Sequence, residues 1–348
     1  MQTIIRKVDE NCIDEMIMKE AGALLKEGAL VAFPTETVYG LGANALDSEA
    51  AAKIYAAKGR PSDNPLIVHI ADMDALSLIV AEIPEAATKL AEKFWPGPLT
   101  MVMRKSDVVP YGTTGGLDTV AVRMPAHPIA LEMIRHGGGY IAAPSANTSG
   151  RPSPTLASHV ADDMDGIVPL ILDGGAVGIG IESTIVDLTD EIPTILRPGF
   201  ITKEMLQEVV GEVQIDKGLD ADSKTPPKAP GMKYRHYAPK AELMIVEGSS
   251  EAVVAKINAL VRENEEKGIC TGIIGTEETV SRYPTGIVKC MGTRNDELSI
   301  SSHLYGILRE FDESDAKVIY SESFEEGAMG SAIMNRLLKA AGHKIIHE

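Results

Sequence analysis

After residue 240 the chain alternates short apolar segments with amphipathic ones, and this alternation constrains the fold more than any other feature. The pattern runs strand 242–246, helix 251–264, strand 269–274, strand 287–291, helix 302–311, strand 318–321 and helix 332–341. Strands that alternate with helices favour right-handed crossovers and a parallel sheet. We therefore predict a small α/β domain with a Rossmann-like parallel sheet over residues 240–348.

The first 213 residues mix strands and helices less regularly. Strands are expected at 29–33, 66–70, 99–103, 119–124, 140–143, 167–172, 184–188 and 194–196, and helices at 13–27, 48–57, 84–94, 127–136 and 202–210. Residues 34–42 are expected to form a loop. The mixture favours an α/β domain of α+β character with a twisted, mixed sheet over residues 1–213. Residues 214–239 are rich in Asp, Lys, Ser and Pro and are typical of a linker.

Composition excludes several classes of function. The net charge of −17 argues against a protein that coats nucleic acid, so any binding of polyanions has to be local. Cys12, Cys270 and Cys290 lie far apart without the spacing of a metal site, which fits a reducing cytosol. No signal peptide and no apolar run of membrane-spanning length is evident, so we expect a cytoplasmic protein without membrane contact.

Two cations flank a glycine at Lys58-Gly59-Arg60, directly before Pro61. Gly59 frees the backbone and Pro61 biases Arg60 away from helical geometry, so a stiff loop that carries two cationic groups is expected. Such groups suit phosphate, with lysine as a point charge and arginine as a planar fork. On these residues alone, a helix end whose cations complement the helix dipole explains the pattern equally well.

More polar side chains gather at the ends of the expected strands, where open α/β sheets bind ligands. They are Thr35, Thr37, Lys58, Arg60, Ser62, Asn64, His69, Thr119, Arg123, Ser145, Asn147, Ser183, Thr184 and Arg197. Each one alone has a structural explanation; a histidine within a strand, for example, is more often a core residue than a catalyst. Taken together, the four cations and the hydroxyl groups predict an anion-binding cleft. The Walker phosphate-binding pattern is absent, because the chain has no Gly-Lys pair. Residues 137–142 formally fit the dinucleotide fingerprint, but they precede an expected strand instead of following one, so we interpret them as a turn.

These residues resemble the motifs of the YrdC family. Lys58-Gly59-Arg60 together with Ser145-Ala146-Asn147 is similar to that family's lysine-x-arginine and serine-x-asparagine pair, and 34–41 resembles its opening loop. Later blocks match in order at 95–100, 123–125, 183–187 and 196–199. The resemblance covers nearly the whole chain, and the linker with its second α/β domain resembles the long, two-domain form. One departure is Ala229, where the family pattern has serine.

The resemblance implies an enzyme, a nucleotidyltransferase that joins L-threonine, bicarbonate (or carbon dioxide) and ATP. Its products are L-threonylcarbamoyladenylate and pyrophosphate. A separate transfer complex then passes the threonylcarbamoyl group to an adenosine beside the anticodon of tRNA, so no stable tRNA binding by this chain is expected. Magnesium is expected to accompany ATP, with no organic cofactor and no metal site made by the protein alone.

The resemblance also assigns the site residues. Lys58, Arg60, Ser145 and Asn147 are expected to be catalytic through charge and hydrogen-bond donors, without a covalent intermediate. These four are also expected to bind ATP, together with Ser62, Thr119, Ser153, Arg197, Tyr234, His236 and Tyr237. The last three lie in 230–239, which is expected to be a lid within the linker. Residues expected to bind threonine are Thr35, His69, Arg123 (as a fork for the carboxylate), Ala143 (through its backbone) and Ser183.

Two other functions fit part of the sequence. An RNA-binding module would use the cationic cleft without ATP turnover and would bind with a steep salt dependence. The acidic composition argues against this function, as does the lack of aromatic residues between the basic ones. A carbamoyl-adenylate enzyme of the hydrogenase-maturation type would carry zinc-finger and acylphosphatase-like modules, for which this chain has neither the cysteines nor the length.

Overall fold

The computed structural model describes residues 2–216, 236–324 and 327–348, which divide into two compact units. The first unit contains the chain up to Ser149, then Ser153–Gly178, and the described residues from Glu182 to 216. The second unit contains Gly150–Pro152, Ile179–Ile181 and the described residues from 236 onward.

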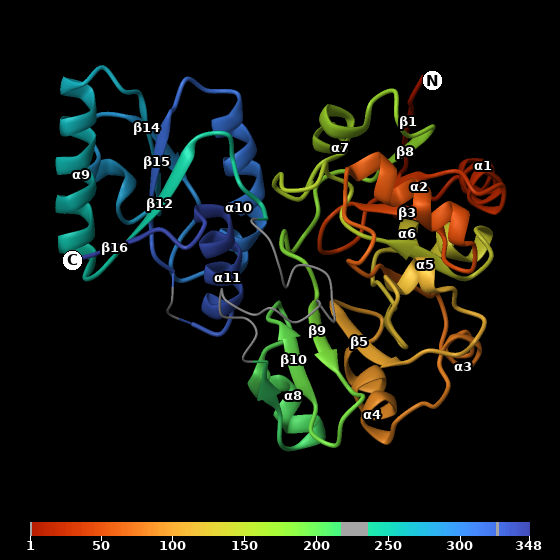
Figure 1. Cartoon of the computed structure of the whole chain (residues 1–348). Helices are drawn as coiled ribbons and strands as arrows, with labels where there is room; N and C mark the ends of the chain where they lie inside the picture. Colours follow the sequence, from red (N-terminus) through yellow and green to blue (C-terminus); the bar gives the residue numbers. More distant parts are fainter. Residues whose placement is uncertain (1, 217–235, 325–326) are drawn as a thin grey trace. The chain divides into compact units, whose positions relative to one another are not determined.

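The first unit is built on an 11-stranded sheet with the order β1-β8-β2-β3-β7-β4-β6-β5-β9-β10-β11 (Figure 1). Its strands are β1 (Ile4–Lys7), β2 (Val31–Phe33), β3 (Gly40–Asn44), β4 (Ile67–His69), β5 (Leu99–Arg104), β6 (Thr119–Arg123), β7 (Ile141–Ala143), β8 (Leu170–Asp173), β9 (Thr184–Asp187), β10 (Thr194–Arg197) and β11 (Gln214–Ile215). The sheet is mixed, because β4 and β6 are parallel whereas β5 and β6 are antiparallel. The predicted mixed α/β sheet is thus confirmed.

Helices cover the two faces of this sheet unequally. They are α1 (Glu15–Lys26), α2 (Ser48–Lys58), α3 (Leu76–Ile79), α4 (Glu85–Phe94), α5 (Tyr111–Thr114), α6 (Pro128–His136), α7 (Ala157–Met164) and α8 (Lys203–Val210). The first face is covered by α2, α4, α7 and α8, with Ile54 and Leu90 in the same apolar cluster as Val68 and Val122. On the second face, α1 and α6 cover β2, β7 and β8.

The remainder of the second face carries a small apolar cluster to which no described helix contributes. Its members are Ile67, Val102, Ala121, Ile185 and Leu196, from β4, β5, β6, β9 and β10. We call this area the helix-free face. It is the part of the sheet on which polar side chains gather.

The second unit is a 5-stranded sheet with the order β14-β13-β15-β12-β16, and its strand pairs are parallel. Its elements are β12 (Glu242–Glu247), α9 (Ser250–Glu266), β13 (Thr271–Gly275), the short 3-10 helix η2 (Val280–Arg282), β14 (Ile287–Cys290), α10 (Glu297–Asp312), β15 (Val318–Glu322), α11 (Gly330–Ala341) and β16 (Ile345–His347). The predicted Rossmann-like parallel sheet is confirmed, with β16 as a strand that the sequence pattern missed.

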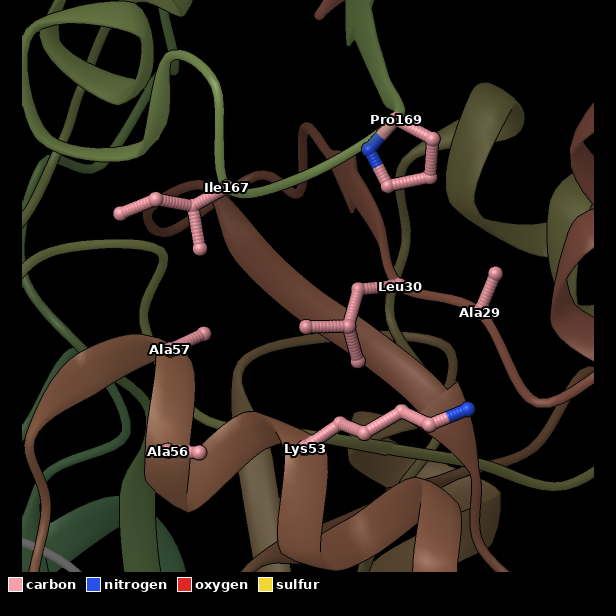
Figure 2. Close-up of a pocket in the computed structure, with 7 residues that line it drawn as sticks. All are labelled: Ala29, Leu30, Lys53, Ala56, Ala57, Ile167 and Pro169. Carbon is pink, nitrogen blue, oxygen red and sulfur yellow. The ribbon is translucent and has the colours of Figure 1, made fainter. Parts of the chain in front are cut away.

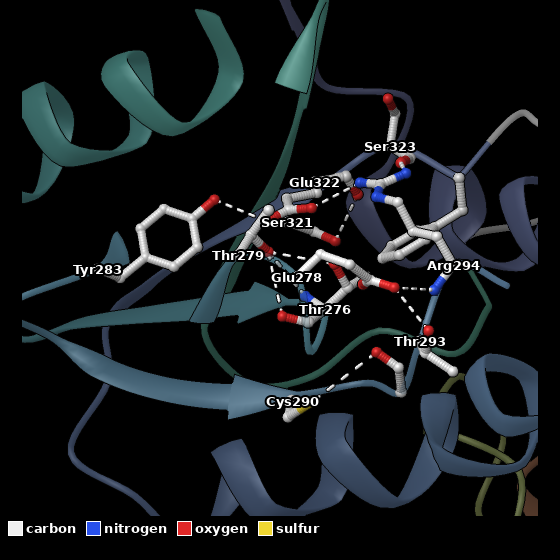
Figure 3. Close-up of polar contacts among 12 residues, drawn as sticks. Thr276, Glu278, Thr279, Tyr283, Cys290, Thr293, Arg294, Ser321, Glu322 and Ser323 are labelled. Atoms are coloured by element: carbon white, nitrogen blue, oxygen red, sulfur yellow. Dashed lines mark hydrogen bonds and ion pairs between the residues drawn. The ribbon is translucent and has the colours of Figure 1, made fainter. Parts of the chain in front are cut away.

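Polar side chains tie together the C-terminal ends of β13, β14 and β15 (Figure 3). The buried carboxylate of Glu322 accepts a hydrogen bond from the Tyr283 hydroxyl at 2.7 Å and pairs with the Arg294 guanidinium at 2.6 Å. Glu278 accepts from the Thr293 hydroxyl at 2.6 Å and from the Arg294 amide at 3.0 Å. Desolvation opposes ionisation of Glu278, but hydrogen bonds from Thr293 and neighbouring groups outweigh it and lower its pKa to about 2. Both carboxylates accept hydrogen bonds from protein groups, so we interpret the network as one that stabilises the fold.

Two short segments of the second unit, Gly150–Pro152 and Ile179–Ile181, interrupt the first unit in sequence. Helix α10 holds both segments. Arg309 donates to the carbonyl of Pro152 at 2.6 Å, and Ser301 donates to the carbonyl of Ile179 at 2.8 Å. Composition alone, which placed the domain limits at 213 and 240, contains no signal for contacts between segments so far apart.

Three local predictions were wrong. Residues 40–44 form strand β3 rather than a loop, and a Cβ on Gly40 or Gly42 would lie 3.0 or 3.1 Å from the Phe33 ring. The glycines therefore make room for an aromatic ring rather than mark a turn. Lys58 is the last residue of α2, and Gly59, at φ 61°, ends the helix in the left-handed region. The expected linker begins with a strand, since Gln214–Ile215 pairs with β10.

Helix α1 packs closely on α6, and Gly22 permits this. A Cβ on Gly22 would lie 2.5 Å from the backbone oxygen of His136. We expect Gly22→Ala to lower the free energy of unfolding by about 1–3 kcal/mol, as overpacking does. The control is Gly306→Ala in α10, where a Cβ meets nothing within 4 Å. There the gain in helix propensity, up to about 1 kcal/mol, should appear instead. Urea unfolding of both variants measures the difference, and equal shifts would contradict the packing argument.

Candidate active site

Hydrogen-bond register places polar residues of neighbouring strands in one row on the helix-free face. His69 of β4 pairs with Arg123 of β6, and Arg123 pairs with Thr100 of β5. Residues in register project to the same face of a sheet. Thr100 in turn pairs with Ile185 of β9, and Ser183, two residues earlier, meets the Thr100 hydroxyl at 2.8 Å. We call His69, Arg123, Thr100 and Ser183 the arginine row.

A second polar group lies at the other end of the same strands. Thr119 stands four residues before Arg123 on β6, which corresponds to about 13 Å at roughly 3.3 Å per residue. Ser145 follows Ala143, the partner of Ile67, by two residues and therefore lies toward the Thr119 end. Between the two ends lies the apolar pair Ile67 and Ala121. The helix-free face thus has polar groups at both ends and an apolar floor.

Lys58 organises the end that contains Ser145. Its side chain is buried, and its ammonium donates to the carbonyl oxygens of Ser145 and Asn147 and to Asn147 Oδ1. The Ser145 hydroxyl donates to the same Oδ1 at 2.5 Å. We call Lys58, Ser145 and Asn147 the lysine end. The structure thus brings together three of the four residues that were predicted to be catalytic.

Arg60 stiffens the loop that follows α2. Its guanidinium donates to the carbonyl oxygens of Asn64 at 3.4 Å and Pro65 at 3.1 Å. Pro65 precedes β4 at the end of the strand that faces the lysine end. Ser62, in the same loop, is exposed. Arg60 thus lies in a loop that its own contacts stiffen, whereas Lys58, the other cation of the predicted loop, belongs to α2.

In the arginine row, Arg123 meets a carboxylate that the sequence argument had not singled out. Its Nη2 lies 2.8 Å from Oε1 of Glu36, and both side chains are largely buried. The two atoms are close but not oriented as a hydrogen bond, so the contact is electrostatic. Nδ1 of His69 donates to the Ile67 carbonyl, 3.1 Å away. Burial, and after it the charge of Arg123, lower the pKa of His69 to about 3, so its ring is neutral.

Ser183 also joins the arginine row to Arg197. Nε and Nη2 of Arg197 donate to the Ser183 carbonyl at 3.1 and 3.0 Å, and Nη2 lies 3.2 Å from the hydroxyl. Ser153 donates to Glu182 at 2.6 Å. Two residues expected to bind ATP, Arg197 and Ser153, therefore lie beside the Glu182-Ser183 dipeptide.

The remaining predicted site residues are Thr35 in the first unit and three aromatic residues of the expected lid. Thr35 is buried, and its hydroxyl accepts from the amides of Thr37 and Val38 at 3.1 and 3.3 Å, which closes a tight turn. His236 and Tyr237 belong to the second unit, where the Tyr237 ring packs 5.1 Å from that of Tyr305. Tyr234 lies outside the described residues, as does most of the expected lid.

Glu36, Thr100 and Glu182 are polar neighbours of the predicted residues that the sequence argument missed. Glu36 and Thr100 lie inside matched blocks, but nothing in their spacing marks them, because their partners come from other strands. The described residues contain no group of three or more His, Cys, Asp or Glu side chains that would hold a metal. Within the same residues, no helix is both long and apolar enough to cross a bilayer.

Two grooves of the first unit lie away from these residues. The larger one measures about 550 Å³ and is lined by Ala29, Leu30, Lys53, Ala56, Ala57, Ile167 and Pro169 (Figure 2). A smaller groove of about 370 Å³ includes Ser62 beside Tyr55 and Tyr111. Neither is lined by a residue of the arginine row or the lysine end. The chemistry of the side chains, rather than the size of a groove, identifies the candidate site.

Two family models match the chain. Residues 23–199 match the Sua5/YciO/YrdC model, described as "Telomere recombination", and residues 201–342 match "Threonylcarbamoyl-AMP synthase, C-terminal domain". The threonylcarbamoyl-AMP synthase of Bacillus subtilis is 51% identical, covering 97% of this chain and 96% of that protein. That of Pyrococcus abyssi is also 51% identical, covering 99% of each.

A solved structure gives the same result. The crystal structure of P. abyssi Sua5 complexed with L-threonine matches with a TM-score of 0.94 and 50% identity, covering 99% of this chain and 100% of that one. Matching models over both units, half-identical relatives over almost the full length and this common fold agree with each other. The chain belongs to the threonylcarbamoyl-AMP synthase family, enzymes that make an adenylate, in its two-domain form.

Proposed function

We propose that the protein joins L-threonine, bicarbonate and ATP into L-threonylcarbamoyladenylate, with release of pyrophosphate and water. Carbon dioxide can replace bicarbonate, in which case no water is released. The product serves the formation of N6-threonylcarbamoyladenosine beside the anticodon of tRNA, through a separate transfer complex. We place the reaction in the cytoplasm, because the widely spaced Cys12, Cys270 and Cys290 fit a reducing compartment.

The observation that carries this proposal is the pair of polar ends on one face. Lys58, Ser145 and Asn147 lie toward the Thr119 end of β6, and Arg123 and His69 form the other end. The four residues of β6 from Thr119 to Arg123 span about 13 Å at roughly 3.3 Å per strand residue. An amino acid joined through a carbamate to a nucleotide phosphate needs recognition at two separated charges. That a half-identical relative was solved with L-threonine supports threonine as a substrate.

In this proposal catalysis is electrostatic. Lys58 and Arg60 lie on the phosphate side, where the magnesium that accompanies ATP would add positive charge, and Ser145 and Asn147 supply polar groups to the developing charge. Thr119, Ser62, Ser153 and Arg197 complete the ATP side. His69, Ser183, Thr35 and the backbone of Ala143 hold threonine, whose carboxylate pairs with Arg123.

The direct test is pyrophosphate release by the purified full chain. We expect release to require both L-threonine and bicarbonate in addition to ATP and magnesium, because the adenylate forms only on the carbamate. Leaving out each substrate in turn provides the controls. Release that ignores threonine, or its complete absence when all substrates are present, would refute the proposed reaction. An RNA-binding module without ATP turnover would also give no release.

The ammonium of Lys58 is expected to matter for rate. Lys58→Ala removes a buried charge and its contacts to the Ser145–Asn147 loop. We expect pyrophosphate release to fall at least about tenfold, since a charge-assisted hydrogen bond is worth about 1.5–3 kcal/mol. Lys53→Ala is the matched control: Lys53 lies on the same helix but donates to the Gly28 carbonyl. Equal rates in the two variants would remove Lys58 from the site.

The neutral ring of His69 predicts a pH dependence of stability. Its pKa in the folded protein, about 3, lies below the ordinary value of 6.5, so the unfolded chain binds the proton more tightly. The stability that the neutral ring contributes is complete above pH 6.5 and is lost as the pH falls toward 3. Between pH 6.5 and 4, the free energy of unfolding should therefore fall more steeply than in His69→Gln, by at most about 1.4 kcal/mol per pH unit. Parallel urea-unfolding curves for the two proteins would contradict the assignment.

A further inference from the structure

Buried polar atoms that lack a hydrogen-bond partner are concentrated around one residue, Glu36. Both carboxylate oxygens of Glu36, Nε and Nη2 of Arg123, and Nδ1 of His127 belong to this group. They make up five of the nine such side-chain atoms among the described residues. Because native proteins leave few buried polar groups unsatisfied, such a concentration indicates a place where a ligand supplies the missing partners.

Two sets of contacts position Glu36. The amides of Thr37 and Val38 donate to the Thr35 hydroxyl, and these hydrogen bonds fix the backbone turn that carries Glu36. The Glu36 side chain contacts strand β6, where its Oε1 lies 2.8 Å from Nη2 of Arg123 without hydrogen-bond geometry. The cation therefore retains donors for a second carboxylate, and Glu36 retains acceptors for a second cation.

Other carboxylates near the arginine row are already engaged. Glu182 accepts from the Ser153 hydroxyl at 2.6 Å. Asp187 accepts from the hydroxyl and the amide of Thr189 at 2.6 and 3.0 Å. Glu36 differs from Glu182 and Asp187, because its carboxylate accepts no hydrogen bond from the described residues.

The two histidines near Glu36, His69 and His127, do not neutralise its carboxylate. His69 in the row is neutral, because burial and the charge of Arg123 lower its pKa. Burial also lowers the pKa of His127, against the carboxylates of Glu10 and Glu36, which raise it. The pair of Glu36 and Arg123 therefore presents one negative and one positive group, about 3 Å apart, in a buried setting.

We propose that Glu36 receives the ammonium group of a free α-amino acid whose carboxylate binds Arg123. The inference rests on the proposed function, in which that amino acid is L-threonine. A zwitterion inserted into the pair supplies donors to Glu36 and acceptors to Arg123, so both buried charges gain hydrogen bonds. An acid without the amino group gives Glu36 no hydrogen-bond donor and places a second negative charge beside its carboxylate. Glu36 is thus a specificity residue, and it orients the nitrogen that becomes the carbamate.

The test compares two ligands on the full-length protein. L-Threonine and 3-hydroxybutanoate differ only in the amino group, and titration calorimetry gives the dissociation constant of each. We expect Glu36→Gln to weaken L-threonine binding at least about tenfold, as the loss of a charge-assisted hydrogen bond does. Binding of 3-hydroxybutanoate should stay the same or tighten, because a repulsive charge is gone. A merely structural support of Arg123 would weaken both ligands by the same factor, which overturns the proposal.

Two further variants secure the interpretation. Glu10→Gln removes a neighbouring carboxylate that lies 3.8 Å from His127 and is half exposed, and it should leave both affinities unchanged. Glu36→Asp keeps the charge but withdraws it by one methylene, so its preference for L-threonine over 3-hydroxybutanoate should fall between those of the parent and Glu36→Gln. Glu36→Asp also replaces Glu36→Gln in the comparison of the two ligands if Glu36→Gln does not fold. Failure of the unmodified chain to bind L-threonine refutes the proposed function itself, whereas normal binding in Glu36→Gln refutes only the role of Glu36.

Discussion

The hydrogen-bond register of β4, β6 and β5 is the constraint on which the candidate site depends. In the observed register, His69, Arg123 and Thr100 share one row on the helix-free face, while Val68 and Val122 project into the core on the other face. Side chains alternate along a strand, so a slip of one residue would bury the charges among the helices and expose the valines. Such a slip is therefore strongly disfavoured by desolvation of the arginine alone. The apolar core on one face thus determines where the polar row lies on the other.

Charged side chains in this unit both hold the backbone and provide chemistry. Lys58 is buried, and its ammonium group donates hydrogen bonds to the loop that carries Ser145 and Asn147. The cation therefore fixes the positions of these polar groups. Arg60 does the same for its own loop. Arg123 differs, because its Nε and Nη2 have no hydrogen-bond partner among the described residues. Groups that are already satisfied preorganise a site, whereas a buried group that is not satisfied indicates where a substrate binds.

Much of the fold was predictable because its signals are local. The sequence pattern of 48–57, 84–94 and 251–264 indicated helices that the structure contains, although the first of them extends one residue further, to Lys58. The order of strands and helices after residue 240 was sufficient to predict a parallel sheet. Strand β3 was missed because Gly40 and Gly42 are common in turns, whereas here they accommodate the Phe33 ring, a contact that no local pattern contains.

The sequence by itself determined the class of each unit, the family, and the residue types that could hold anions, since periodicity and motif spacing act over a few neighbouring residues. Only the tertiary structure decided which of those residues meet. It placed Glu36 against Arg123 and Ser183 against both Thr100 and Arg197, and it assigned Gly150–Pro152 and Ile179–Ile181 to the second unit. These contacts join residues that are 14 to more than 80 positions apart in the sequence. Strand register and the desolvation of buried charges, rather than local propensity, select them.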